Sequence, residues 1–450
     1  MSSQISFRSV SMRPETQLHS PARTKALFDE EHQFIAPGLQ TIALLSELAI
    51  ERGTGATLTD LDGQTYLDLN AGVSVASLGH AHPRYIAALT KQLEAVSVGS
   101  FTSRPRAELV RLIADLAPGE LRRTQFFSGG AEAVEAAIRL ARSSTKRTDI
   151  VGFTGGFHGK TAGVLPLSDV AWKNLIGPLP TGYHLAPYAD PTRFAGSEAE
   201  CREHARKELR KIIEQEVAGR PAAIVIEPIQ GTAGNIVPPP GFLRDVHDVA
   251  HEYGALLIAD EIITGFGRTG RMFGYSRDDV VPDIMTLGKG MASGFPVSAL
   301  VSTDEIMAAK PFSLPSASSS SYGGNPLAAA AALVTIQTIL ADKLVENSAT
   351  VGGLLRDGLQ ALALRHRSIA DVRGQGLLIG FDLVSEQETK TLLKKEKCIE
   401  FFQGCLADGL IMMSYTPRVR VHPPLILSAE EANSALAIID RALERLETEH

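Results

Sequence analysis

The chain has 450 residues, 44% of them hydrophobic and 21% charged, and its formal net charge at pH 7 is −7. This is the composition of a globular protein with a sizeable core, and the length is enough for two or three structural units. No basic block and no apolar run of membrane-spanning length stand out, so we expect neither a nucleic acid nor a membrane as a partner.

The amino-terminal segment and the cysteines bear on where the protein works. The first fourteen residues, MSSQISFRSVSMRP, are rich in serine and lack acidic residues. A transit peptide is one interpretation, but acidic residues follow soon after, and a frayed terminus is favoured. We expect residues 1–34 to form a flexible arm. Three cysteines cannot form a closed set of disulfides, which suits a reducing compartment, and we expect a cytoplasmic protein.

The first predicted elements form an antiparallel hairpin over Ala56–Leu69. In the stretch GATLTDLDGQTYLDL, apolar and polar residues alternate on either side of an Asp-Gly turn.

Helical and strand-like segments alternate from about residue 105 onward. Residues 108–117 (ELVRLIADLA) and 132–142 (EAVEAAIRLAR) have the apolar spacing of helices. Residues 149–153, 222–228 and 254–261 are short continuous apolar runs, which are typical of parallel strands covered on both faces. The alternation predicts an α/β fold in which a three-layer unit contains a mostly parallel sheet.

A serine-rich stretch, LPSASSSSYGGNP (Leu314–Pro326), is the one low-complexity segment. Helical sequence follows it, with two further strand-like runs, GLLIGFDLV and RVRVHPPL. These predict a smaller α+β unit, to which the amino-terminal hairpin also contributes. We therefore expect a large domain over residues 76–330 and a small domain built from residues 35–75 and 331–450.

Two acidic residues, Asp260 and Glu261, end the apolar run GALLIADE. Asp260 is therefore expected at the carboxyl end of a buried strand, which is where ligands bind in open α/β sheets. A buried aspartate is unfavourable unless a cation pairs with it, so its presence indicates a binding site. A helix cap or a structural salt bridge is the alternative.

Two glycine-rich segments precede this strand. In FFSGGAEAVEAAIRLAR, a strand runs through Gly129 and Gly130 into a helix, and the free backbone N–H groups of such a turn are typical of an anion site. The segment lacks both common phosphate-binding motifs, so simple turn chemistry is an alternative. In GGFHGKT, Phe157 and His158 stand in a loop where an aromatic ring can cover a flat ligand, although such a pair is more often packing.

Lys289 lies in TLGKGMASGFP, a segment of glycine and small residues with no other charge. Lysine strongly prefers water, and the flanking glycines add backbone freedom that folding must remove. The segment is therefore either a mobile surface loop or a device that presents the amine to a ligand.

Taken in order and spacing, these motifs resemble the class III, or subgroup II ω-type, pyridoxal-phosphate aminotransferases. The stretches IVIEPIQG, LLIADEIITGFGRTGRMF, PDIMTLGKGMASGFPVSALV and SSYGGNPLAAAAAL match the signature of that family, and LGHAHP and VRVHPPL match its ends. The resemblance covers residues 35–445. It implies the PLP-transferase fold type I, pyridoxal 5'-phosphate (PLP) as cofactor with pyridoxamine 5'-phosphate as its intermediate form, no metal, and a homodimer or higher homo-oligomer.

The resemblance also implies a role for each candidate residue. Lys289 is the Schiff-base lysine and the proton-transfer group, and an uncrowded apolar setting lowers the pKa of its amine. Asp260 faces the pyridine nitrogen of the cofactor. The other implied roles are the phosphate site at Gly129, Gly130 and Ala131, the ring-stacking Phe157, the cofactor contacts His158 and Ile263, the supporting Glu227, Ser321 at the phosphate of the other subunit, and the substrate residues Arg420 and Val73. For Ser321, a flexible linker is the alternative.

The sequence departs from the family pattern at three positions. Gly129 removes a hydroxyl that many members have at the phosphate turn. Thr232 stands where members acting on 4-aminobutyrate or ornithine have a glutamate, and Ile263 stands where they have a glutamine. In those members the glutamate pairs with the carboxylate-binding arginine, here Arg420, when an ω-amine is bound. Without it, Arg420 is either free to bind a carboxylate with its forked donors or must swing out of the pocket.

Two functions follow from these features. The leading hypothesis is a ping-pong transaminase that moves an amino group from an ω-amino acid or amine to pyruvate or 2-oxoglutarate. The alternative is an amino-acid racemase or epimerase, in which the same lysine returns the proton to the same carbon. A regulator that binds the cofactor without catalysis would need an added recognition module such as a helix-turn-helix, and none is evident in the sequence.

Overall fold

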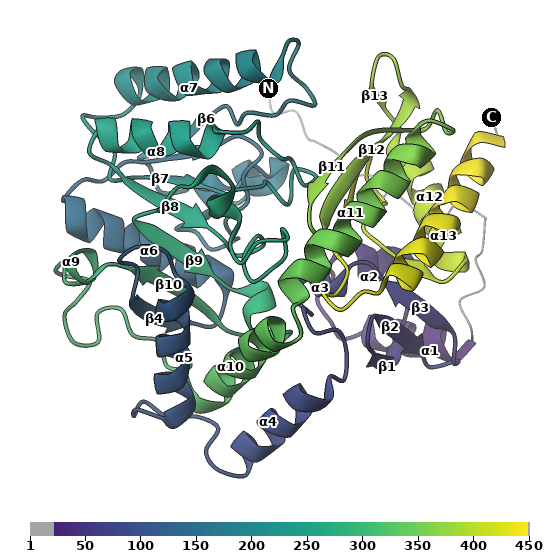
Figure 1. The fold of residues 1–450 in the computed structure, drawn as a ribbon, viewed down its shortest axis with the longest axis horizontal. Coiled ribbons are helices and arrows are strands. Elements are labelled where there is room, and N and C mark those ends of the chain that lie inside the picture. The colour runs from purple at the N-terminus through teal and green to yellow at the C-terminus, as the bar shows by residue number, and fades with distance from the viewer. Residues whose placement is uncertain (1–21, 449–450) are drawn as a thin grey trace, which may run out of the picture.

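The computed structural model describes residues 22–448, which form a larger and a smaller group of sheets and helices side by side (Figure 1). Residues 1–21, which hold the serine-rich segment considered as a transit peptide, lie outside the described residues, as do residues 449–450. Within the segment expected to be an arm, Ala22–Glu31 form the helix α1. The backbone N–H of Thr24 donates to the Asp62 carboxylate at 2.8 Å, which ties this helix to the hairpin turn.

A seven-stranded sheet forms the centre of the larger group. The strand order is β4-β10-β9-β8-β7-β5-β6, and among these strands only β10 runs antiparallel to its neighbours. The strands are β4 Arg123–Phe127, β5 Ile150–Phe153, β6 Tyr183–Ala186, β7 Ala223–Ile226, β8 Leu256–Asp260, β9 Ile284–Leu287 and β10 Ser298–Ser302. The three apolar runs predicted as parallel strands are β5, β7 and β8, which confirms that prediction.

Helices cover both faces of this sheet. Successive residues of a strand point to opposite faces, so each strand contacts helices on both sides. In β7, Ala223 and Val225 pack against α6, whereas Ile224 and Ile226 pack in the core that includes α7 and α8 (Figure 1). The predicted three-layer α/β unit is therefore confirmed. The helices of this group are α4 Pro83–Leu93, α5 Arg104–Leu116, α6 Gly130–Thr145, α7 Glu198–Gln215, α8 Phe242–Glu252, α9 Asp304–Met307 and α10 Pro326–Ala341.

The smaller group is built from the amino-terminal and the carboxy-terminal parts of the described chain. The hairpin predicted over Ala56–Leu69 is present as the antiparallel pair β2 and β3, and β14 from the carboxy-terminal part adds to β3 in parallel. The second sheet places β12 between β11 and β15, with β13 at the end of β12. The strands are β1 Ile50–Thr54, β2 Thr57–Asp60, β3 Thr65–Asp68, β11 Ile369–Gln375, β12 Leu378–Glu386, β13 Thr391–Leu392, β14 Leu410–Ile411 and β15 Arg418–Val421. The helices are α2 Thr41–Ser46, α3 Ala71–Ser74, α11 Leu344–Ala363, α12 Lys395–Ala407 and α13 Ala429–Thr448.

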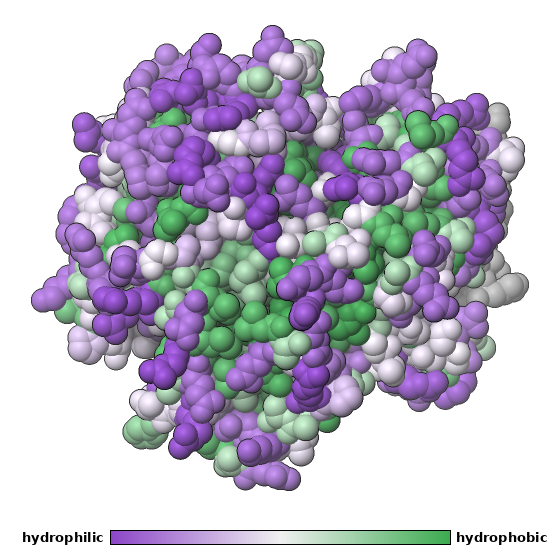
Figure 2. Space-filling view, viewed as in Figure 1, coloured by the Kyte–Doolittle hydropathy of each residue, from purple (hydrophilic) through white to green (hydrophobic). Residues whose placement is uncertain are grey.

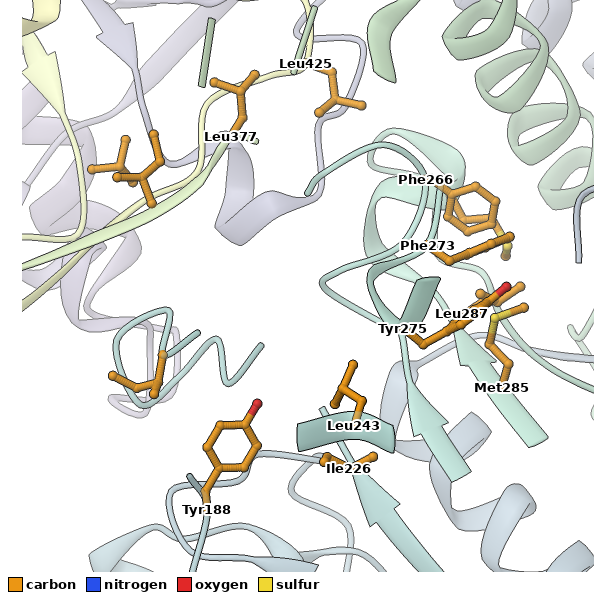
Figure 3. Close-up of a cluster of buried hydrophobic side chains, with 14 of the residues drawn as sticks. Tyr188, Ile226, Leu243, Phe266, Phe273, Tyr275, Met285, Leu287, Leu377 and Leu425 are labelled. Atoms are coloured by element: carbon orange, nitrogen blue, oxygen red, sulfur yellow. The ribbon is translucent and has the colours of Figure 1, made fainter. Parts of the chain in front are cut away.

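An aromatic cluster lies in the loop that follows β8 (Figure 3). Phe273 stacks on Tyr275 with ring centroids 5.8 Å apart and meets Phe266 edge-on at 5.7 Å. The buried Glu261 carboxylate accepts hydrogen bonds from the backbone N–H groups of Gly274 and Tyr275, at 2.9 and 2.7 Å. Burial raises the pKa of Glu261 to about 7. Glu261 therefore organises the loop, while its neighbour Asp260 is left to face the other way.

No single helix among residues 22–448 is long and apolar enough to cross a membrane. The helices α10 and α11 reach such a length only as a pair, and they meet at an angle of 66°.

Candidate active site

A cavity of about 310 Å³ lies at the carboxyl ends of the central strands. Its wall brings together nine of the residues singled out in the sequence: Gly130, Ala131, Phe157, His158, Glu227, Thr232, Asp260, Ile263 and Lys289. They come from segments that are far apart in the chain, and the parallel sheet gathers them because its strands end at one edge.

Lys289 enters this cavity directly after β9. Its backbone lies in the left-handed region, at φ 41°, which is a strained conformation for a residue with a side chain. Gly288 and Gly290 leave no room for side chains, because a Cβ at either would lie 2.9 Å from the Ile262 side chain or 2.5 Å from the Ser77 hydroxyl. Close packing thus holds the lysine in a fixed place, and the surface-loop alternative does not describe this segment.

The electrostatic setting of Lys289 favours a neutral amine. Burial lowers the pKa of Lys289 to about 8, and the nearby Glu227 and Asp260 carboxylates oppose that effect without cancelling it. The positive charges of Arg420 and Arg268 lower the pKa further. A fraction of the amine is therefore unprotonated near neutral pH.

Asp260 lies at the end of β8 and is 3% exposed. One carboxylate oxygen accepts from the Thr286 hydroxyl at 2.9 Å and from the Ile262 N–H at 3.2 Å, and the other bonds to Nδ1 of His158 at 2.7 Å. Burial lowers the pKa of His158, but the hydrogen bond to Asp260 and its charge outweigh burial and raise it overall. The expected cation beside Asp260 is thus supplied in part by the protein itself, since His158 lies against the carboxylate.

The start of α6 offers a second polar wall. Gly129 is the N-cap and has an extended backbone, and the Glu132 carboxylate accepts from the N–H groups of Gly129 and Ser128, at 2.7 and 3.0 Å. The N–H groups of the first helical residues, Gly130 and Ala131, have no partner within the helix, and both residues line the cavity. Gly159 packs so closely on this turn that a Cβ would lie 2.4 Å from the Ala131 methyl. The N–H groups of Gly130 and Ala131 are therefore the part of this turn that is left for an anion, because Glu132 occupies those of Ser128 and Gly129.

The Glu227 carboxylate bonds to the backbone of two loops rather than to another side chain. Its carboxylate accepts from the backbone N–H of Phe157 at 2.8 Å and from that of Gly231 at 3.1 Å. Burial raises the pKa of Glu227 to about 7, although the neighbouring His158 acts in the opposite direction. The support expected for the Asp260 region thus takes the form of holding the Phe157 loop and the Thr232 loop beside the cavity.

The two substrate residues expected from the sequence, Arg420 and Val73, belong to the smaller group. Arg420 lies on β15 and is not among the residues that line the cavity, whereas Thr232, in the segment after β7, lines it. Burial together with the positive charges of Arg420, Arg268 and Lys289 lowers the pKa of His422 well below its usual value. This side of the site is therefore electropositive. Val73 packs beside Met413 and Tyr415 in a separate apolar cluster, whereas Val75, two residues later, lines the cavity.

Ser321 is not part of this cavity within a single chain. It is exposed and lies in the loop before α10. Large apolar side chains are exposed at nearby positions, including Phe101 at 87% and Tyr322 at 66%. In the space-filling view, apolar surface gathers across the middle of the molecule, in the region of α10 (Figure 2).

Three site residues were not predicted from the sequence. Thr286 pairs with Asp260 in the register of β8 and β9, so aligning the ends of the two predicted strands would have identified it. Arg268 is 2% exposed and its guanidinium donates to the Leu377 carbonyl at 3.2 Å. Arg268 carries no local signal, because its partner Leu377 is 109 positions away, whereas Tyr415 is close to Arg420 in the chain and was overlooked.

Comparison with known proteins places this geometry in a family context. Residues 42–443 match the family model described as aminotransferase class-III. An acetylornithine aminotransferase of Methanopyrus kandleri is 34% identical over 397 residues, which cover 87% of this chain and 93% of that protein. An alanine/serine racemase of Pyrococcus horikoshii is 33% identical over 439 residues, which cover 94% and 90%. The crystal structure of a PLP-bound amine transaminase from an uncultivated Pseudomonas species has a TM-score of 0.86 and 30% identity, and the match covers 92% of this chain and 98% of that one.

The lowered pKa of Lys289 predicts a stability effect that does not depend on any ligand. Between about 8 and 10.5, its folded and ordinary pKa values, the unfolded chain holds a proton that the folded chain lacks, so wild-type stability rises with pH. In cofactor-free protein, Lys289→Met should therefore be more stable than wild type near pH 7, by on the order of 3 kcal/mol. This advantage should shrink as the pH approaches 10.5, and urea unfolding at several pH values measures it.

A matched control is Lys395→Met, which removes an exposed lysine on α12. Its difference from wild type should not depend on pH. If the Lys289→Met difference is equally independent of pH, the amine is not electrostatically disfavoured in the fold.

Proposed function

We propose that this chain, which belongs to the class-III aminotransferase family, uses PLP to move an amino group from an ω-amino acid or amine to pyruvate or 2-oxoglutarate. The observation that carries the proposal is the placement of the Lys289 amine in one cavity with the Asp260 carboxylate and the open helix start at Gly130. An amine for an aldehyde, an anion for a ring nitrogen and N–H donors for a phosphate are the three groups that PLP requires.

The residues present fit the cofactor. Gly130 and Ala131 would hold its phosphate, Phe157 would cover one ring face and Ile263 would contact the ring. PLP, when bound, supplies an aldehyde that condenses with amines and a ring that accepts electrons from the adjoining carbon. Asp260, fixed by its bonds from His158 and Thr286, would stabilise a proton on the ring nitrogen.

Lys289 would carry the proton transfer. Its pKa of about 8 is close to neutrality, where a base both accepts and returns a proton effectively. Its Nζ would take the proton from the reacting carbon of the amine donor, hold it and give it back within the cavity. The packed glycines around it fix the position of its backbone, so the motion is confined to the side chain.

The substrate class follows from Thr232 and Arg420. Because Thr232 carries no charge, no acid at this position holds the guanidinium, and Arg420 is available for the carboxylate of an incoming 2-oxo acid. An amine without a carboxylate is also accommodated if Arg420 turns aside. This favours an amine–oxo acid transaminase over one restricted to 4-aminobutyrate or acetylornithine.

A second candidate function is amino-acid racemisation or epimerisation. It is supported by the alanine/serine racemase that is 33% identical to this chain. The same lysine and cofactor would serve both reactions, and the difference lies in whether the proton returns to the carbon from which it came.

A half-reaction screen tests the function directly. Purified holoenzyme is mixed with single amines and amino acids, and the products are analysed for carbonyl compound and pyridoxamine phosphate. A transaminase forms both in equal amounts with the donor alone. A racemase yields the opposite enantiomer and accumulates no pyridoxamine phosphate, and that result would establish the second function instead of the first.

Lys289→Ala should retain non-covalent PLP but lose transamination by several orders of magnitude, because the covalent anchor and the base are removed together. The visible absorbance of lysine-bound cofactor should also be missing. Turnover close to wild type in this variant would refute the role of Lys289. Lys160→Ala, which removes an exposed lysine of the Phe157 loop, is the matched control.

Asp260→Asn should leave the fold intact and slow proton removal sharply. A neutral amide cannot stabilise a proton on the ring nitrogen, so the ring accepts electrons less well. Single-turnover rates with saturating PLP measure this effect. Rates within a few fold of wild type would show that Asp260 has no such role.

The proposal includes a homodimer in which Ser321 serves the phosphate site of the other subunit. The exposed Phe101 and Tyr322 supply apolar area for such an interface. Lys289→Ala and Ser321→Ala chains, each weakly active alone, should regain activity when mixed, because each hybrid then has one site with both residues. Absence of rescue, together with a fully active monomer in sedimentation, would contradict the shared site.

A further inference from the structure

Thr232 reaches the cavity from a short loop between β7 and α8, which runs from Gln230 to Ile236 and is called the Thr232 loop below. The loop closes on itself, because Gln230 and Ile236 exchange backbone hydrogen bonds at 3.1 and 3.0 Å. Its first half is anchored to the larger group through the Gly231 N–H, which donates to the Glu227 carboxylate at 3.1 Å. The position of Thr232, the next residue, therefore depends on what holds the second half.

Two arginines of the smaller group donate to backbone carbonyls in that second half. Arg418, on β15, donates to the Ala233 carbonyl at 3.0 Å, and Nε of Arg373, on β11, donates to the Gly234 carbonyl at 2.9 Å. A charged donor forms a stronger hydrogen bond than a neutral one does. These two bonds therefore tie the Thr232 loop firmly to two strands of one sheet.

A third residue of the loop, Asn235, also contacts the smaller group. Its side chain donates to the Ile379 carbonyl of β12 at 2.6 Å and bonds to Nε2 of His422 at 3.0 Å. Gly380 leaves room for this approach, because a Cβ there would lie 2.4 Å from the Gly234 carbonyl oxygen. The loop therefore lies directly on the sheet formed by β11, β12 and β15.

Both arginines that hold the loop are paired with an acid. Arg373 contacts Asp382 at 2.7 Å, and Arg418 contacts Asp190 at 3.3 Å. Asp382 is fully buried and has a second partner, Arg193, at 2.7 Å. In the described part of the chain, Arg193 donates to this acid but not to the Thr232 loop. The ion pairs and the bonds to the loop can therefore be perturbed separately.

We propose that Arg373 and Arg418 are positioning residues that hold Thr232 at the cavity, so that the smaller group fixes one wall of the substrate pocket through the Thr232 loop. This rests on the proposed function, because it concerns how tightly that pocket binds its amine donor. Thr232 is exposed, so the anchored ends of its loop, rather than packing around its side chain, determine where it lies. The backbone of Lys289 is held by separate contacts. A loosened loop should therefore weaken donor binding and leave proton transfer unchanged.

Arg373→Met tests this, because it removes the donor to the Gly234 carbonyl and keeps an unbranched side chain in the same space. The amine half-reaction of the holoenzyme is followed at increasing concentrations of benzylamine. We expect the KM for benzylamine to rise about tenfold, the scale of one lost hydrogen bond from a charged group. The maximal rate should stay within about threefold of wild type, because the loop does not take part in the proton transfer. An unchanged KM, or a lower maximal rate at unchanged KM, overturns the proposal.

Arg193→Met is the matched control. It removes a cation from the same buried acid, Asp382, and leaves the bonds to the loop, so its KM should match wild type. Equal rises in both variants would overturn the proposal, because the ion pairs would then act by stabilising the smaller group as a whole. If Arg373→Met does not fold, Arg418→Met takes its place, since the Arg418 side chain is 24% exposed and that of Arg373 only 7%. It should also raise the KM, and an unchanged value overturns the proposal.

A double variant tests whether Arg373 acts through Thr232. In a Thr232→Ala background, Arg373→Met should raise the KM for benzylamine less than it does in wild type, because the side chain that it positions is already gone. Fully additive effects would overturn the proposal, since Arg373 would then act on the pocket by another route.

A measurement on cofactor-free protein separates this inference from the proposed function. Hydrogen exchange followed by mass spectrometry reports how often the loop opens, because the N–H groups of Gly234 and Ile236 are bonded within it. Peptides that cover residues 230–236 should exchange about tenfold faster in Arg373→Met than in wild type or in Arg193→Met. Equal exchange in all three proteins overturns the inference. If the wild type forms no pyridoxamine phosphate with any donor, the proposed function fails, and the exchange rates still show whether Arg373 holds the loop.

Discussion

The site depends on keeping one amine, that of Lys289, buried in a cavity with no direct ionic partner among residues 22–448. Burial alone would make it a neutral base, and a contacting carboxylate would make it a permanent cation. The fold avoids both extremes. Glu227 accepts from two backbone N–H groups and Asp260 bonds to His158, so each carboxylate is occupied and acts on Lys289 only through its field. With the resulting pKa of about 8, the amine can act as a base near neutral pH.

The parallel sheet makes this arrangement possible. Strands β7, β8 and β9 end side by side, so the residues that follow them meet although they are tens of positions apart in the chain. Glu261 is turned toward the core and secures the loop after β8, while Asp260 faces the cavity. The smaller group then supplies Arg420 from β15, and its positive charge lowers the pKa of Lys289.

The sequence predicted what depends on local pattern. The hairpin, the alternating α/β unit and the position of Asp260 at a strand end follow from periodicity and turn residues, and the structure confirms them. The bond of His158 to Asp260 was not predicted. It joins residues 102 positions apart. It leaves no periodic signal, since a single long-range contact is compatible with many local sequences.

Chemical trapping of the cofactor tests the central claim most directly. The purified protein is loaded with PLP, reduced with borohydride, digested and mapped by mass spectrometry. The account predicts a stable phosphopyridoxyl adduct on the peptide that contains Lys289, at close to one per chain, with other lysines essentially unmodified. An adduct spread over exposed lysines, or concentrated on a lysine outside the cavity, would contradict the account, because the buried neutral amine would then not be the group that the cofactor meets.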